Sequence, residues 1–157
     1  MHFRSLTLLA LLNIVSLSVA PPPAEVKRMK MKVRWMAEQL VVRLDSRVGP
    51  TRLAITVDDF DGLSSFATIL EGYNNLIFDS FHAYAQVKAE ISSLTGYIIQ
   101  WRRVHCSTQQ TRTPMPSSLQ ALQSQRRHVH TITLEALRRM KELLDQLLRN
   151  LEHLDTC

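Results

Sequence analysis

Two cysteines, Cys106 and Cys157, are the residues of this chain whose chemistry is easiest to assign, because two thiols can form a disulfide. Cys157 ends the sequence, and Cys106 lies in a polar stretch directly after a helical pattern. Two cysteines allow one intramolecular pairing, so the alternatives are free thiols or a bridge between chains. We expect the intramolecular disulfide, because the chain begins like a secretory protein and secreted proteins mature in an oxidising compartment.

Other residues with metal-binding or catalytic chemistry form weaker patterns. The segment Asp58-Asp59-Phe60-Asp61-Gly62 superficially resembles a calcium loop, but it lacks the ligand spacing and the closing Glu of an EF-hand. His128 and His130 lie two positions apart, which on a helix points them to different sides. No phosphate-binding glycine loop or nucleophile motif occurs. We therefore expect a solvated acidic loop and no enzyme activity, metal site or cofactor.

The first 20 residues have the three parts of a secretory signal peptide. Met1 to Arg4 is short and basic, Leu6 to Ala20 is apolar, and Ser18-Val19-Ala20 matches the small-residue pattern before a cleavage site. The apolar part is short for a membrane span, which needs about 20 residues. Removing 20 of 157 residues leaves 137, enough for one domain with its own core. We therefore expect a signal over residues 1–20, one domain over residues 21–157, secretion, and no stable membrane insertion.

Composition favours a helical globular domain over a nucleic-acid-binding protein. Hydrophobic residues make up 45% of the chain, and its few glycines and clustered prolines separate apolar segments. The net charge is +5, and loss of Arg4 with the signal lowers it to +4. This mild excess can steer an acidic partner. Because the Lys and Arg residues are interleaved with acids, the sequence does not predict a nucleic-acid partner.

Apolar residues recur at steps of three and four in the elements that must position the cysteines, which predicts amphipathic helices. The first helix begins after Pro23, ends near Asp45–Ser46, and has on its apolar face Val26, Met29, Val33, Met36, Ala37, Leu40 and Leu44. The second begins near Ser64 and has Leu63, Phe66, Ile69, Leu70, Tyr73, Leu76 and Ile77. The third follows a tight turn near Ser80–Ala83, ends around Arg103–Cys106, and has Tyr84, Val87, Ile91, Leu94, Ile98 and Trp101.

A fourth long helix begins near Thr131 or Thr133, and Thr133 is a candidate for its cap. Its unusually wide apolar face consists of Leu134, Leu137, Met140, Leu144, Leu147, Leu148, Leu151 and Leu154. A short, weak helix over Leu119, Leu122 and Val129 precedes it in the connection. A wide apolar face indicates that the last helix contacts several neighbours at once.

The lengths of the connections predict the order of helix directions. The first and third connections are long enough to cross a bundle from end to end, and the second is short. We therefore expect an all-α four-helix bundle with up-up-down-down topology and two long crossovers. In that topology the third and fourth helices end at the same end of the molecule, where Cys106 and Cys157 can meet.

Several segments resemble the leptin family, in its fish-type members. They are Ile91–Tyr97 leading to Trp101 and Cys106, Leu134–Leu137 leading to Cys157, and Val33–Leu40. The paired cysteines, one after the third helix and one at the end, match the family signature. The resemblance covers nearly the whole chain. It implies a secreted helical cytokine hormone that binds a class I cytokine receptor, triggers JAK/STAT signalling, and acts in appetite and energy balance.

Helical spacing offers its own candidate for a docking surface. Trp35 lies nearly opposite the apolar face of the first helix, and Met31 and Val42 share that side. Tryptophan is a frequent interface anchor, although packing of Trp35 against a loop is the alternative. On the third helix, the side away from the core carries small residues, including Ser93 and Gly96, which leave a flat surface.

The resemblance places the main receptor-binding surface on the first and third helices. Its residues in this chain are Lys32, Trp35, Gln39 and Arg43, with Gln86, Ser93, Gly96 and Tyr97. A second family surface uses the first connection and the start of the last helix. It falls on Asp58, Asp59, Phe60 and Asp61, with Thr131 and Ile132. The first connection, with Asp59-Phe60-Asp61, carries more acid than the mammalian pattern.

Two other interpretations fit the same helical pattern. A secreted amphipathic-helix protein that binds lipid also has long helices and few cysteines, although the disulfide and the wide last face favour a packed core. An unrelated four-helix cytokine shares the fold but has another receptor. We expect the free protein to be a monomer.

Overall fold

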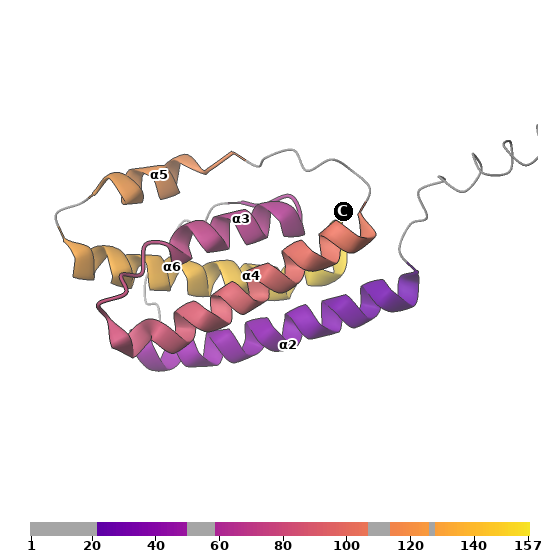
Figure 1. Ribbon diagram of the computed structural model, residues 1–157, viewed down its shortest axis with the longest axis horizontal. Helices are drawn as coiled ribbons and strands as arrows, with labels where there is room; N and C mark the ends of the chain where they lie inside the picture. Colours follow the sequence, from indigo (N-terminus) through magenta and orange to yellow (C-terminus); the bar gives the residue numbers. More distant parts are fainter. Residues whose placement is uncertain (1–21, 50–58, 107–113, 126–127) are drawn as a thin grey trace, which may run out of the picture.

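The computed structural model describes residues 22–49, 59–106, 114–125 and 128–157, and in these ranges the chain forms α-helices and no strand (Figure 1). The long helices are α2 (Pro23–Val48), α3 (Leu63–Asn74), α4 (Ala85–His105) and α6 (Val129–Asn150). Shorter pieces are the 3-10 turn η1 (His82–Tyr84), helix α5 (Ser117–Ser124) and the 3-10 turn η2 (Leu151–His153). The all-helical prediction is confirmed. The predicted signal over residues 1–20 lies outside the described residues.

Helix α2 begins and ends where its sequence contains a proline and a glycine. Pro23 fits the first helical position because its fixed φ is helical and its missing N–H would have no helical partner. Gly49 follows the last residue with a φ of 71°, a left-handed value that favours glycine. The residues buried along α2 are Met29, Val33, Ala37, Leu40 and Leu44, all predicted from the spacing.

Helix α3 is shorter than its apolar pattern predicts. The hydroxyl of Ser65 accepts the backbone N–H of Gly62 at 3.2 Å, which satisfies a donor at the start of the helix. The helix ends at Asn74, whose side-chain amide donates to the hydroxyl of Ser92 on α4 at 3.1 Å. Ile77 therefore lies beyond the helix, yet it is buried in the core. The chain begins to turn at residue 75, before the predicted turn at Ser80–Ala83.

Helix α6 begins before either residue predicted for its start. Val129 is its first residue, so it belongs to α6 and not to the short preceding helix, which spans Ser117–Ser124. Thr133 is not a cap: its side chain is fully buried, and its hydroxyl donates to the carbonyl of Leu76 at 3.3 Å. The wide apolar face packs against both α2 and α3, as the sequence indicates.

Contacts at both ends of the helices fix their directions. Glu25 at the start of α2 pairs with His105 at the end of α4, 3.3 Å apart. Arg43 near the end of α2 pairs with Glu90 near the start of α4, 2.8 Å apart. Helices α2 and α4 therefore run antiparallel.

Helix α3 runs antiparallel to α6 by the same argument. The backbone N–H of Leu63, its first residue, donates to the carbonyl of Asp155 after η2 at 3.2 Å. Leu76, just past its end, meets Thr133 in the first turns of α6. Lys30 of α2 bonds to Glu152 beyond the end of α6, so α2 also opposes α6. Helices α2 and α3 thus run one way and α4 and α6 the other, an up-up-down-down order (Figure 1).

The disulfide joins the ends of the two parallel helices α4 and α6. Cys106 follows α4 directly, and Cys157 follows the η2 turn. Their sulfurs are 2.03 Å apart and their Cα atoms 5.5 Å apart, across 51 positions of sequence. The predicted intramolecular pairing is confirmed. None of the helices in the described part of the chain is both long and apolar enough to span a membrane.

Candidate functional site

An exposed apolar stripe runs along the outer side of α2. Met31, Trp35 and Val42 are 63%, 62% and 67% exposed, whereas the stripe on the opposite side is buried in the core. The three residues lie four and seven positions apart, so they share one side of the helix. Trp35 thus points outward, as its spacing predicts.

Side chains across the seam between α2 and α4 join the two helices into one surface. The Lys32 ammonium lies over the ring of Tyr97, 4.3 Å from its centroid, in a cation–π contact. Arg43 pairs with Glu90, and the Gln86 amide donates to the same carboxylate at 2.9 Å. Four of the predicted surface residues therefore meet at this seam, with Glu90 as a link that the sequence did not single out.

Tyr97 presents a neutral hydroxyl on this surface. Partial burial raises the pKa of Tyr97 above its ordinary value of 10.0, and the positive charge of Arg28 opposes part of that effect. The phenol is therefore protonated at neutral pH and can donate a hydrogen bond to a partner.

The outer side of α4 is flat beside the seam. The Ser93 hydroxyl donates to the carbonyl of Ala89 in its own helix at 3.1 Å. A Cβ atom built on Gly96 would have no neighbour within 4 Å. Gln39 is exposed on α2, seven positions after Lys32 and so on the same side of that helix. A partner could therefore approach the backbone of α4 closely.

Val104 extends this surface and was not predicted. It is 65% exposed near the end of α4. It lies seven positions after Tyr97, so helical spacing alone could have identified it. The stripe on α2, the seam residues and the outer side of α4 with Val104 together form what we call the α2–α4 face.

The acidic residues of the predicted second surface lie near the end of α6. The Asp59 carboxylate accepts a hydrogen bond from the amide of Gln146 at 3.4 Å. Phe60 packs its ring against the edge of Phe66, 5.3 Å between centroids, and is partly buried. Asp61 is exposed. Asp58 lies outside the described residues.

The two halves of that second surface are not brought together. Thr131 is exposed in the first turn of α6, 15 positions before Gln146, which corresponds to about 22 Å along the helix. Ile132 is only 5% exposed and packs in the core, so it offers almost no surface to a partner. It is buried because the apolar face of α6 extends through its first turn.

The geometry does not favour a metal site or a lipid-binding face. In the ranges that the structure describes, no three His, Cys, Asp or Glu side chains gather where they could hold a metal ion. The wide apolar face of α6 is used inside the bundle, where Leu137, Leu144 and Leu147 are fully buried, and it is not free to bind lipid.

Relatives of known family identify the group to which the chain belongs. No protein-family model and no solved structure matches it. It is 40% identical to leptin of Tetraodon nigroviridis over 157 residues, which covers 96% of this chain and 98% of the relative. It is 41% identical to leptin of Takifugu rubripes over 162 residues, which covers 99% of each chain. With such identity over nearly its whole length, the chain belongs to the leptin family.

Proposed function

We propose that this protein is a secreted helical cytokine hormone that docks on a class I cytokine receptor of the leptin-receptor type through its α2–α4 face. Receptor engagement triggers JAK/STAT signalling in the control of appetite and energy balance. Family membership supports the hormone class. The single observation that supports the surface is the exposed Trp35, flanked on α2 by exposed Met31 and Val42.

The core does not account for this stripe, because the core uses the opposite side of the same helix. Tryptophan often dominates the binding energy of an interface when it fills a partner's pocket. The flat side of α4 and the neutral hydroxyl of Tyr97 provide shape and a hydrogen-bond donor next to this anchor. The free protein is a monomer in this proposal, with Trp35 left for the receptor.

The test is the affinity of the Trp35→Ala variant for a purified leptin-receptor ectodomain. We expect a loss of about tenfold or more, as for a central interface anchor. We expect the free energy of unfolding to change by less than about 0.5 kcal/mol, because the side chain is largely exposed. Unchanged affinity would reject the proposed surface.

A matched control comes from α6, which packs against α2 and α3. Arg138→Ala removes another exposed long side chain there and should leave the affinity unchanged. Parallel measurements on ectodomains of other class I receptors test the receptor assignment. Tighter binding to one of those would favour the interpretation as a different four-helix cytokine.

For the second surface we propose two separate contacts at opposite ends of α6. One consists of Asp59 and Asp61, and the other is Thr131. The Asp59→Asn/Asp61→Asn pair and Thr131→Ala, assayed separately for STAT phosphorylation in receptor-bearing cells, test them. A contact whose substitution leaves the signal unchanged is not part of the surface.

A further inference from the structure

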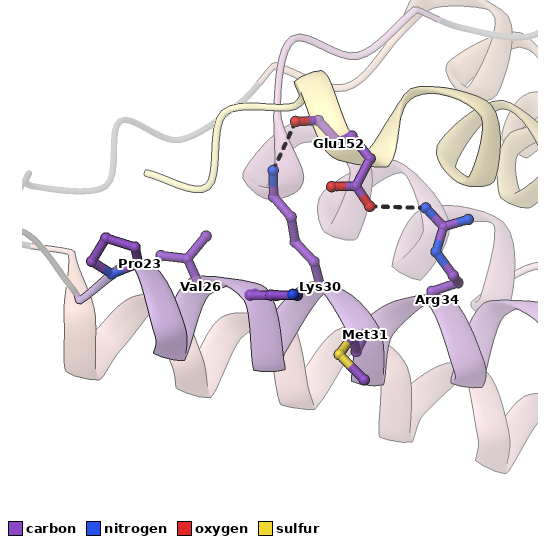
Figure 2. Close-up of a pocket in the computed structure, with 7 residues that line it drawn as sticks. Pro23, Val26, Lys30, Met31, Arg34 and Glu152 are labelled. Carbon is purple, nitrogen blue, oxygen red and sulfur yellow. Dashed lines mark hydrogen bonds and ion pairs between the residues drawn. The ribbon is translucent and has the colours of Figure 1, made fainter.

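A basic groove lies on the opposite flank of α2 from the α4 seam. It has a volume of about 400 Å³ and runs between the first half of α2 and the η2 turn. Figure 2 shows Lys30 and Arg34 extending from α2 to Glu152, with Pro23 and Val26 further toward the start of the helix. The walls of the groove thus combine charged groups with apolar surface.

The sequence at this groove is unusually basic for the chain. Residues 27–34 read KRMKMKVR, five bases in eight positions without an acid. Three of them, Lys27, Lys30 and Arg34, line the groove and are opposed by one lining carboxylate, Glu152. The groove therefore carries an excess of two positive charges, whereas the other two bases, Arg28 and Lys32, lie toward α4.

Glu152 holds two of the cations in place without covering them. The Lys30 ammonium donates to the Glu152 backbone carbonyl at 3.0 Å, and the Arg34 guanidinium pairs with its carboxylate at 3.0 Å. Both side chains of that pair remain partly exposed, at 38% and 66%. Positioned cations lose less conformational entropy when they bind an anion.

The spacing suits a linear polyanion. Lys27, Lys30 and Arg34 are three and four positions apart, so the charges repeat about every 5 Å along one side of α2. A flat membrane surface cannot enter a groove, whereas an extended chain can lie in it. Short basic runs of this kind are typical of patches that bind heparin-like polyanions.

We propose that this groove binds a sulfated glycosaminoglycan chain of the heparan sulfate class. The inference goes beyond receptor binding and depends only on secretion from the proposed function. The groove lies on the other flank of α2 from the Lys32–Tyr97 seam, but Met31 lines the groove and also belongs to the exposed stripe, so the two proposed sites adjoin. By binding the glycan, the groove would retain the hormone at cell surfaces.

The experiment measures the affinity of the mature protein for a heparin oligosaccharide of defined length, by calorimetry and by the salt concentration that elutes it from heparin. Lys27→Gln should weaken binding about threefold, the effect expected of one exposed ion pair. The triple variant Lys27→Gln/Lys30→Gln/Arg34→Gln should weaken it about thirtyfold and elute at lower salt. Arg47→Gln/Arg103→Gln/Arg138→Gln removes the same charge from exposed positions elsewhere and should retain most of the affinity.

A gain of affinity gives the sharper test. Glu152→Gln removes the opposing charge but keeps an oxygen that can accept from Arg34, so it should tighten heparin binding about threefold. If the triple variant folds poorly, Lys27→Gln alone remains informative, because the Lys27 side chain is exposed.

Four results would overturn the proposal. They are equal losses in the control and groove triple variants, no gain in Glu152→Gln, equal binding to poly-glutamate, and groove-dependent binding to phosphatidylserine vesicles in place of heparin. Trp35→Ala distinguishes the heparin proposal from the receptor proposal, because this variant should lose receptor affinity and keep heparin affinity.

Discussion

At the scale of single residues, Asp145 on α6 carries a carboxyl group whose surroundings favour its protonated form. Burial raises the pKa of Asp145, and Glu142 adds to this effect, while Lys141 and Arg149 oppose it. Because the pKa is raised on folding, the group's contribution to stability is present below the ordinary pKa and is lost as pH rises through the raised one. At neutral pH the charged form therefore destabilises the fold.

Asp145→Asn should consequently raise the melting temperature at pH 7 by about 2 °C. The difference should vanish below about pH 3, where the carboxyl is protonated in the folded and unfolded chains. Calorimetry over this pH range measures both effects. Glu38→Gln, which removes a negative charge from an exposed position on α2, serves as the control and should not change the melting temperature. A lower melting temperature for Asp145→Asn at pH 7 would show that the contact with Lys141 outweighs burial.

Single residues were predictable from sequence where helical spacing alone decides their direction. Trp35 follows from the buried stripe of its own helix. Ile132 and Thr133 were assigned to a surface and a cap, but both are buried, because the start of α6 is set by packing against α3 and not by a capping residue. A single sequence does not carry that tertiary contact.

At the scale of helices, substitution of alanine at two glycines is expected to change stability in opposite directions. Gly72 lies where α5 packs on α3, and a Cβ atom there would come 2.5 Å from a methyl carbon of Leu119, which is fully buried, and 3.2 Å from the sulfur of Met115. Gly96 lies inside α4, with open space around the position of a Cβ atom. The same substitution therefore tests packing at one site and helix propensity at the other.

Gly96→Ala should stabilise the protein by about 0.5–1 kcal/mol, because alanine loses less backbone entropy in a helix. Gly72→Ala gains the same term but must displace Leu119, and overpacking costs about 1–3 kcal/mol. We expect a net loss of stability and faster hydrogen exchange in α5. Urea unfolding and exchange of the α5 amides measure these effects. Equal stabilisation by both substitutions would show that α5 adjusts freely.

The approximate positions of the helices could be predicted from periodicity, but several helix ends could not. Helix α2 is bounded by Pro23 and Gly49, which are visible in the sequence. Helix α3 ends at Asn74, whose side chain bonds to Ser92 on α4, although the apolar pattern continues to Ile77. A periodic pattern does not carry tertiary contacts of this kind.

At the scale of the whole molecule, connection lengths and the two cysteines together predict the arrangement of the bundle. Long first and third connections require α4 and α6 to run the same way, and that brings Cys106 next to Cys157. The second surface could not be predicted in this way, because the resemblance gave residues without the distance between them. Asp59 and Thr131 lie at opposite ends of α6.

The disulfide should contribute to stability throughout the bundle without touching Trp35, the proposed receptor anchor. It closes a loop across 51 positions, which the chain-entropy model values at about 4 kcal/mol. The buried Arg102 donates a hydrogen bond to the Cys157 carbonyl at 3.3 Å, so the end of the chain is held by this contact as well as by the disulfide.

Cys106→Ser/Cys157→Ser should therefore lower the free energy of unfolding in urea by about 4 kcal/mol. Dithiothreitol should lower the stability of the parent to that of the variant and leave the variant unchanged, which separates the bond from the effect of serine at those positions. Receptor affinity, measured where the variant is still folded, should stay close to that of the parent, because Trp35 and the seam residues lie along α2 and α4. Loss of affinity in the folded variant would mean that contacts at the disulfide end of the bundle, rather than Trp35, dominate receptor binding.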